Sequence, residues 1–205
     1  FSLAPLTNRI TYLEDGDWAI LTDNSLDIFD ANGKSIERPI QVKDASASIV
    51  DKGRHKHFMA KEIFEQPEVI SHTFAHYVNA HEATVKIPEI DFDTSDIKRI
   101  VLVACGSAYY AAMTGRYWLE TLAGISTDID IASEFRYRDV PMDKNTLAVF
   151  VTQSGETADT LAALKACKTQ NVKTLAIVNA PDSSMQREAD ITLPTFAGPE
   201  IGVAS

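Results

Sequence analysis

The sequence has only two cysteines among its 205 residues, Cys105 and Cys167. Two thiols supply neither the disulfide framework of a small secreted domain nor the ligand spacing of a zinc site. We place Cys105 at the end of a buried strand and Cys167 in a helix. Both are therefore expected to be free thiols in a reducing compartment.

Runs of basic residues are lacking as well, and the formal net charge is -10 with a pI of about 4.9. An acidic chain without a basic patch repels nucleic acid and anionic membranes. No apolar run approaches the roughly 20 residues that cross a bilayer, and no signal peptide is visible. We therefore expect a cytoplasmic protein with no nucleic-acid partner and no membrane partner.

Two common phosphate motifs are also missing, because there is no G-x-G-x-x-G and no Walker A lysine. A dinucleotide or a nucleoside triphosphate is therefore disfavoured, and a smaller phosphorylated ligand fits better. His72 and His76 are four residues apart, a spacing that places them on one face of a helix. No HExxH-type acidic partner accompanies them, so we predict no metal site and no cofactor.

What is present is an ordinary globular composition, 45% hydrophobic and 23% charged, with strand and helix patterns alternating from Ile87 onward. Five strands are predicted at residues 99–105, 128–132, 147–151, 172–178 and 191–193. Helices are predicted at residues 108–122, from Gly155 onward, and after residues 182–184. This alternation predicts an α/β fold, an open, doubly wound parallel sheet with right-handed crossovers.

The preceding residues have a different character. Residues 1–43 alternate like short antiparallel strands, with hairpin turns predicted at residues 14–17 and at Asn32 and Gly33. Residues 44–83 are predicted to be a helical linker, in which Pro67 ends one helix and begins a second. The predicted division is thus residues 1–43, 44–83 and 84–205.

The function is expected to depend on residues 146–157 (TLAVFVTQSGET), where a buried strand passes directly into a turn and then a helix. The first N–H groups of a helix carry partial positive charge and attract anions. Thr152, Ser154 and Thr157 add hydroxyl groups, and Gly155 allows a ligand to approach the backbone. A phosphate fits this turn; the alternative is that Ser154 is only an N-cap.

A second turn of this type follows the first strand of the sheet, at Cys105, Gly106 and Ser107. In open parallel sheets, ligands bind beyond the carboxyl ends of the strands, where the strand order reverses. If the first and third strands are neighbours there, both turns open into one crevice. The alternative is structural, with Gly106 only making a tight turn.

Residues 152–157 resemble the SQSGET signature of sugar isomerase (SIS) domains, which have a flavodoxin-like sheet. Four further segments narrow the resemblance to the glutamine–fructose-6-phosphate aminotransferase family: residues 57–67 (HFMAKEIFEQP), 104–107 (ACGS), 133–138 (SEFRYR) and 200–205 (EIGVAS). Residues 1–43 are similar to the C-terminal end of that family's glutaminase domain. The resemblance extends over essentially the whole chain.

The resemblance implies that the chain takes part in converting fructose 6-phosphate and glutamine to glucosamine 6-phosphate and glutamate, for amino-sugar synthesis. It assigns to the sugar phosphate Cys105, Gly106, Ser107, Thr152, Gln153, Ser154, Thr157, Val203 and Ser205. Ala108 stands where the common form has a serine, so one hydroxyl of the site is lost. Glu156 is expected to point away from the phosphate. The family also implies a homodimer.

Catalytic residues are expected outside this chain. The family's nucleophilic cysteine is the first residue of its glutaminase domain, whereas residue 1 here is Phe1. Its Schiff-base lysine, general-base glutamate and ring-opening histidine come from a second SIS domain and a C-terminal tail. We therefore expect a piece of a longer enzyme, truncated at the end of its first SIS domain, that binds the sugar phosphate without turnover.

Two other interpretations stay open. A sugar-phosphate-sensing SIS module of a transcription regulator would use the same crevice without chemistry. Such regulators carry a basic helix-turn-helix before the SIS domain, where this chain has an acidic, hairpin-like segment. A purely structural doubly wound domain would leave the two hydroxyl-rich turns without a role.

Overall fold

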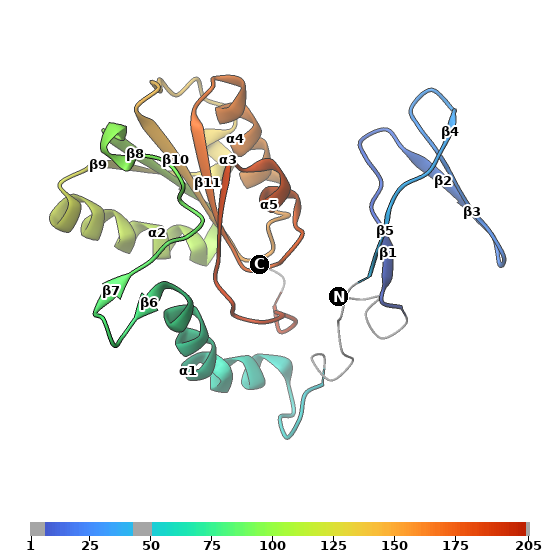
Figure 1. Cartoon of the computed structure of the whole chain (residues 1–205), viewed down its shortest axis with the longest axis horizontal. Helices are drawn as coiled ribbons and strands as arrows, with labels where there is room; N and C mark the ends of the chain where they lie inside the picture. Colours follow the sequence, from blue (N-terminus) through green and yellow to red (C-terminus); the bar gives the residue numbers. More distant parts are fainter. Residues whose placement is uncertain (1–6, 43–50, 204–205) are drawn as a thin grey trace. The chain divides into compact units, whose positions relative to one another are not determined.

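The computed structural model describes residues 7–42 and 51–203 (Figure 1). The chain divides into two compact units, Phe1–Gly53 and Arg54–Ser205. The smaller unit is built from short strands, and the larger one carries the α/β sheet. In the part of the chain that the structure describes, no helix is both long and apolar enough to cross a membrane.

The strands of the smaller unit are β1 (Arg9–Thr11), β2 (Trp18–Leu21), β3 (Leu26–Phe29), β4 (Ser35–Ile36) and β5 (Ile40–Val42). All pairs are antiparallel, as predicted, and β3 and β4 form the predicted hairpin, with Gly33 at φ +77°. The predicted hairpin between residues 9–13 and 18–22 is wrong, because β1 pairs with β5 and not with β2.

The turn at residues 14–17 is tied to a distant segment, which explains this error. Asp17 accepts a hydrogen bond from the Glu14 N–H at 2.9 Å and pairs with Arg38 Nε at 2.8 Å. The Arg38 guanidinium holds the pKa of Asp17 below its usual range. Because Arg38 lies just before β5, this pair favours the β1–β5 pairing, a long-range contact that local turn residues do not report.

Helix α1 (Phe58–Tyr77) runs through Pro67, so the predicted pair of separate helices is wrong. Proline removes one helical hydrogen bond and crowds the preceding turn, which bends a helix without always ending it; Figure 1 shows α1 changing direction along its length. Tertiary contacts hold both halves. Glu62 accepts hydrogen bonds from the backbone of residues 201 and 202, and the Tyr77 hydroxyl donates to the Pro194 carbonyl at 2.8 Å.

A short hairpin, β6 (Val78–Asn79) with β7 (Thr84–Val85), and a 3-10 turn, η2 (Thr94–Asp96), lead into the sheet. The sheet strands are β8 (Arg99–Ala104), β9 (Ser126–Ile131), β10 (Thr146–Thr152), β11 (Lys173–Val178) and β12 (Ile191–Pro194). Their order is β12-β11-β10-β8-β9 with every pair parallel. The predicted doubly wound, flavodoxin-like sheet is confirmed.

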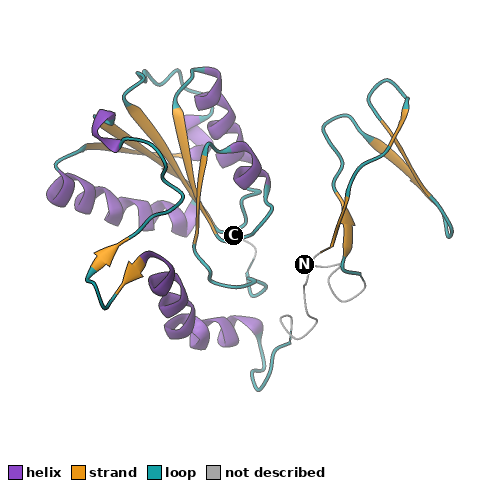
Figure 2. Ribbon diagram, in the orientation of Figure 1, coloured by secondary structure: helices purple, strands orange, loops and turns teal. Residues whose placement is uncertain are grey.

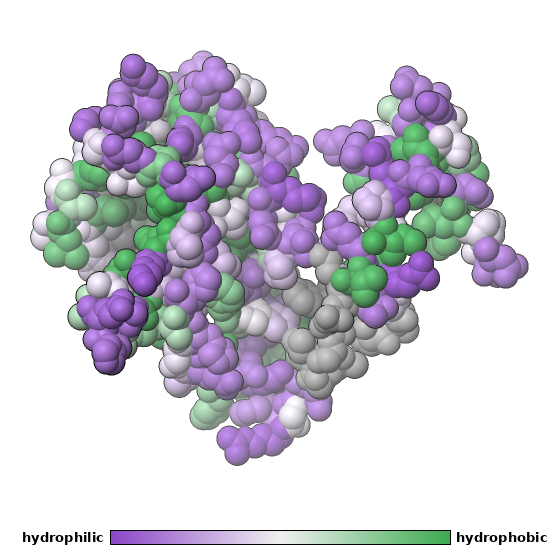
Figure 3. All heavy atoms as spheres, viewed as in Figure 1, coloured by the Kyte–Doolittle hydropathy of each residue, from purple (hydrophilic) through white to green (hydrophobic). Residues whose placement is uncertain are grey.

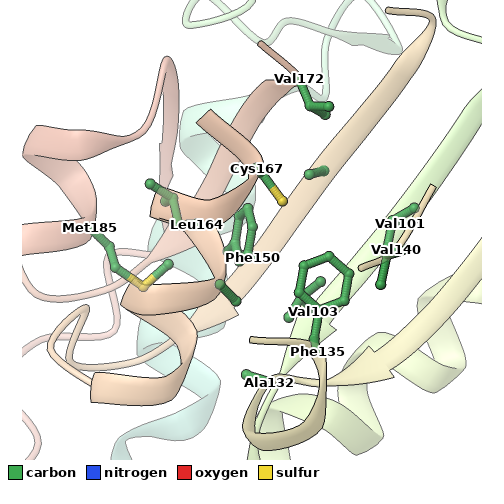
Figure 4. Close-up of a cluster of buried hydrophobic side chains, with 12 residues drawn as sticks. Val101, Val103, Ala132, Phe135, Val140, Phe150, Leu164, Cys167, Val172 and Met185 are labelled. Atoms are coloured by element: carbon green, nitrogen blue, oxygen red, sulfur yellow. The ribbon is translucent and has the colours of Figure 1, made fainter. Parts of the chain in front are cut away.

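Helices cover both faces of this sheet (Figure 2). They are α2 (Gly106–Trp118), the π-helical turn η3 (Leu119–Ala123), α3 (Ala132–Phe135), α4 (Ala158–Thr169) and α5 (Ser184–Glu188). Alternate residues of the central strands point to opposite faces. Val103 and Phe150 pack against α3, α4 and α5 (Figure 4), whereas Leu102 and Val149 pack on the side of α2. Two apolar layers therefore enclose the sheet.

The starts of α2 and α4, and the presence of α3, differ from the sequence-based prediction. The helix predicted from Gly155 begins at Ala158, because the left-handed backbone of Gly155, at φ +64°, belongs to the turn that precedes the N-cap residue Thr157. The four-residue helix α3 was not predicted. The predicted glycine cap is confirmed, since Gly124 ends η3 in the left-handed region at φ +65°.

Asp190 fastens the start of β11 to the start of β12. It accepts hydrogen bonds from Thr174 N at 2.9 Å and Thr174 Oγ1 at 2.8 Å, and lies 3.2 Å from Lys168 Nζ. Burial acts to raise the pKa of Asp190, but the hydrogen bonds from Thr174 and Lys168 outweigh it and lower the pKa below its usual value.

We expect Asp190→Asn to lower the free energy of unfolding at pH 7 by about 1 kcal/mol, since the carboxylate is partly exposed. A lowered folded-state pKa stabilises the protein above the unfolded-state pKa of about 3.9, and this stabilisation is lost as the pH falls through the lower folded value. Urea unfolding between pH 7 and pH 3 should therefore show the difference from wild type narrowing below about pH 4. Asp139→Asn, at an exposed position, is the control. A difference that stays constant to pH 3 would contradict this role.

Candidate functional site

The turns after β8 and β10 leave the sheet side by side. Strand β8 pairs with β9 on one edge and with β10 on the other, so the strand order reverses at this point. Val151 lies opposite Ala104 in the parallel register, which places Thr152 beside Cys105 at the carboxyl ends of the two strands. The condition for a shared site, neighbouring first and third strands, is met.

The turn after β10 is held by two of its own hydroxyl groups and by the turn after β11. The Gly155 N–H donates to Thr152 Oγ1 at 3.2 Å, and the Glu156 N–H donates to Ser154 Oγ at 3.2 Å. The Gln153 carbonyl accepts from the N–H groups of Asn179 and Ala180, which follow β11, at 3.2 and 2.9 Å. The backbone of this turn is thus fixed from both sides.

Ser154 is not the N-cap residue of α4, although its hydroxyl accepts the Glu156 N–H within the turn. Helix α4 begins three residues after the expected position, and its N-cap is Thr157, with φ −61° and ψ +115°. The Thr157 side chain makes no capping hydrogen bond. The N–H groups of the first turn of α4 therefore have no hydroxyl cap from Thr157, which suits an external anion.

The turn after β8 is open where the turn after β10 is tight. Gly106 has φ +57°, and a Cβ added there would meet no atom within 4 Å. Its left-handed backbone, and not its packing, is what requires glycine. Ser107 is exposed, and the half-buried Cys105 Sγ accepts from Thr160 Oγ1 of α4 at 3.9 Å. The other thiol, Cys167, is fully buried in the core, where burial raises its pKa to about 12. Cys105, at the turn after β8, is therefore the thiol at the site.

The remaining predicted site residues lie at the end of the chain. Val203 is exposed, and the two residues before it, Ile201 and Gly202, donate backbone hydrogen bonds to Glu62 Oε1 of α1 at 2.7 and 2.9 Å. Ser205 lies outside the described residues. The assignment of Val203 and Ser205 to the sugar phosphate stays a prediction.

Asn179 organises the edge of the site, although no sequence motif singled it out. Its side-chain oxygen accepts from the Ala197 N–H at 2.7 Å, and its amide nitrogen donates to the Gly198 carbonyl at 2.6 Å. Because its backbone N–H also donates to Gln153, it joins the turn after β10 to residues 195–198. Its position directly after a buried strand, like that of Cys105, was the available signal.

Histidines do not gather into a ligand set. Within residues 7–42 and 51–203, no group of three or more His, Cys, Asp or Glu side chains is placed to hold a metal ion. His76 Nε2 lies 2.9 Å from Glu89 Oε1, and its ring packs against Tyr77 and Phe196. His76 therefore contributes to the packing of α1 against residues after β12.

This architecture matches that of a known protein family. The profile of the SIS domain family matches residues 93–205, which is more than half of the chain. This chain belongs to the SIS domain family. The two turns described above are therefore the strand-to-helix turns of an SIS domain, at its point of strand-order reversal.

Several curated relatives of this SIS chain carry the same name. The chain is 54% identical over 204 residues to the glutamine–fructose-6-phosphate aminotransferase (isomerizing) of Brucella abortus, a comparison covering 100% of this chain and 34% of the relative. The chain thus spans about a third of the length of the curated relatives it matches. The resemblance identified from the sequence is confirmed.

Comparison with solved structures gives a consistent result. The C-terminal domain of the glucosamine-fructose-6-phosphate aminotransferase of Francisella tularensis is 44% identical, with a TM-score of 0.70, over 76% of this chain and 44% of that chain. The sugar isomerase domain of an RpiR transcription factor from Sphaerobacter thermophilus is 18% identical, with a TM-score of 0.51, over 71% of this chain and 77% of that chain. The second similarity extends to the fold alone.

Proposed function

We propose that this SIS chain is the sugar-phosphate-binding part of a glutamine–fructose-6-phosphate aminotransferase. In the whole enzyme, fructose 6-phosphate bound here would react with glutamine to give glucosamine 6-phosphate and glutamate, supplying amino-sugar synthesis in the cytoplasm. The name and the 54% identity of the Brucella abortus relative support this activity. The chain contributes binding residues, and turnover needs residues from outside it.

One observation carries the proposal: two hydroxyl-bearing turns lie next to each other where the strand order reverses. We place the phosphate at the first turn of α4, with the hydroxyl groups of Ser154 and Thr157 as neighbours. Thr152 and Gln153 support the phosphate and the sugar from the end of β10. We place the sugar against Cys105, Gly106 and Ser107, and we assign Val203 and Ser205 to the same ligand.

Glu156 fits this arrangement, although it carries a negative charge within the turn. Its Oε1 accepts a hydrogen bond from the Ser184 N–H, at the start of α5, at 2.6 Å. The carboxylate is therefore directed toward the neighbouring loop and away from the first turn of α4. This geometry lets a phosphate dianion approach the helix.

We also infer a homodimer for the whole protein. Apolar and aromatic side chains of α2 and η3 are exposed, among them Tyr110, Tyr117, Trp118 and Leu122. Figure 3 shows hydrophobic atoms at the surface over this part of the molecule. Exposed apolar patches of this kind mark surfaces that another protein surface covers.

Titration calorimetry with fructose 6-phosphate, with fructose as the unphosphorylated comparison, tests the binding function. We expect binding to fructose 6-phosphate only. We expect Ser154→Ala to weaken that binding roughly tenfold, the value of one hydrogen bond to a charged group. The matched control is Ser126→Ala, at the opposite, amino end of β9, which should bind like wild type. Equal binding of the two sugars, or no binding of either, would contradict the proposal.

A further inference from the structure

The proposed phosphate site has an unfavourable charge in its own sequence. Residues 152–160 (TQSGETADT) include two carboxylates, Glu156 and Asp159, and no cationic side chain. A phosphate monoester has a second pKa near 6 and is close to a dianion at pH 7. Hydroxyl groups and helix N–H groups can bind it, but two nearby carboxylates oppose it. The surrounding structure has to offset at least one of them.

Glu156 is turned away from the site by its hydrogen bond from Ser184, whereas Asp159 stays at the site. Asp159 lies in the first turn of α4, two residues after Thr157. Its carboxylate there acts in two ways. It repels a phosphate bound at the same helix end, and it can itself accept hydrogen bonds from the N–H groups that the phosphate needs.

Arg136 offsets this charge from a different part of the fold. Its Nη1 lies 2.6 Å from Asp159 Oδ1, and the two side chains are only 29% and 38% exposed. The hydrogen bond with Asp159 raises the pKa of Arg136, which therefore stays charged at every working pH. The neighbouring Phe135, fully packed in the core with Val103, anchors the backbone that carries Arg136 (Figure 4).

We propose that Arg136 is a positioning residue for the sugar phosphate, pairing with Asp159 so that the N-terminal end of α4 can accept a dianion. This inference rests on the proposed function. It also gives a role to the SEFRYR segment: its short helix α3 places Phe135 in the core and Arg136 beside α4. The other arginine of the segment, Arg138, pairs with Asp130 of β9 and not with α4.

Calorimetric titration of four proteins with fructose 6-phosphate tests the pairing: wild type, Arg136→Gln, Asp159→Asn and the double variant. Arg136→Gln leaves Asp159 uncompensated and should weaken binding roughly tenfold. Asp159→Asn leaves the arginine charge unpaired and should tighten binding about threefold. The double variant should return to within about twofold of wild type, because neither charge remains.

Two further variants separate charge from folding. Arg136→Lys keeps the positive charge and should recover most of the affinity. Arg99→Gln removes an arginine–aspartate pair of similar length, 2.6 Å to Asp128, at the amino end of β8 and should bind like wild type. If Arg136 only supported the fold, the double variant would bind fructose 6-phosphate as weakly as Arg136→Gln, or more weakly. That result would overturn the proposal.

Phosphorus NMR of bound fructose 6-phosphate gives an independent readout. A nearby uncompensated carboxylate raises the second pKa of the bound phosphate, so this pKa should be higher in Arg136→Gln than in wild type and should return in the double variant. An unchanged phosphate pKa together with unchanged affinity in Arg136→Gln overturns this inference while leaving the binding function intact. Failure of the wild-type chain to bind fructose 6-phosphate overturns the proposed function, and this inference with it.

Discussion

Replacing Gly155 by alanine should lower the free energy of unfolding by about 3–5 kcal/mol and abolish sugar-phosphate binding. Two costs add. Gly155 has φ +64°, which an L-residue adopts only with strain, and an added Cβ would lie 2.2 Å from Ser183 Oγ and 2.5 Å from Ser183 Cβ. Ser183 cannot move freely, because it is buried and its hydroxyl accepts from the Gln186 N–H as the N-cap of α5.

The matched control is Gly124→Ala in the same unit. Gly124 has nearly the same φ, +65°, but an added Cβ there meets no atom within 4 Å. Only the backbone strain applies, so we expect a loss of about 1–2 kcal/mol. Urea unfolding of the three proteins measures both values. If the two variants lose the same free energy, the contact with Ser183 is unimportant, and only the backbone conformation requires glycine at the turn.

Phe150→Ala should destabilise the protein to a similar extent, by about 3–5 kcal/mol. The Phe150 side chain is fully buried in the middle of β10 and points toward α4, where Leu164 and Cys167 pack around it (Figure 4). Its removal leaves a cavity between the central strand and the helix that carries the proposed phosphate site. We expect weaker fructose 6-phosphate binding as a consequence, since α4 loses its support.

Phe64→Ala is the control for this second change. Phe64 is 71% exposed on α1, so removing its ring should alter the free energy of unfolding by no more than about 0.5 kcal/mol. Thermal or urea unfolding followed by circular dichroism compares the two. A loss below about 1 kcal/mol for Phe150→Ala would mean that the layer between β10 and α4 collapses to fill the space.

The sheet could be predicted from the sequence because its signals are local. Residues 100–104 and 146–150 are continuous apolar or β-branched runs, and the structure buries every residue of both. Such runs occur where helices cover both faces of a parallel strand. The turns after them were also predictable, since small and hydroxyl residues follow directly. Neighbouring turns then followed from the topology rules for doubly wound sheets.

The errors share one origin, which is contact between residues far apart in the chain. The first hairpin was predicted from a turn at residues 14–17, yet Arg38 ties that turn toward β5. Pro67 was predicted to end a helix, yet contacts from residues 194–202 hold both halves of α1. Local propensity is a weak guide when such contacts outweigh it. The start of α4 was predicted too early because Gly155 has a left-handed backbone conformation. Gly155 also lies close to Ser183, a contact far away in the sequence.

The sequence by itself determined the α/β class, the five strands of the parallel sheet, and the two turns that define the candidate site. Each of these depends on apolar periodicity and small residues within a few positions of one another. Only the tertiary structure decided which strands of the smaller unit pair, that Asn179 contacts Gln153, and that Arg136 contacts Asp159. These two residues lie 20 or more positions along the chain from the residues that they contact, so the contacts depend on folding geometry and leave no local sequence pattern.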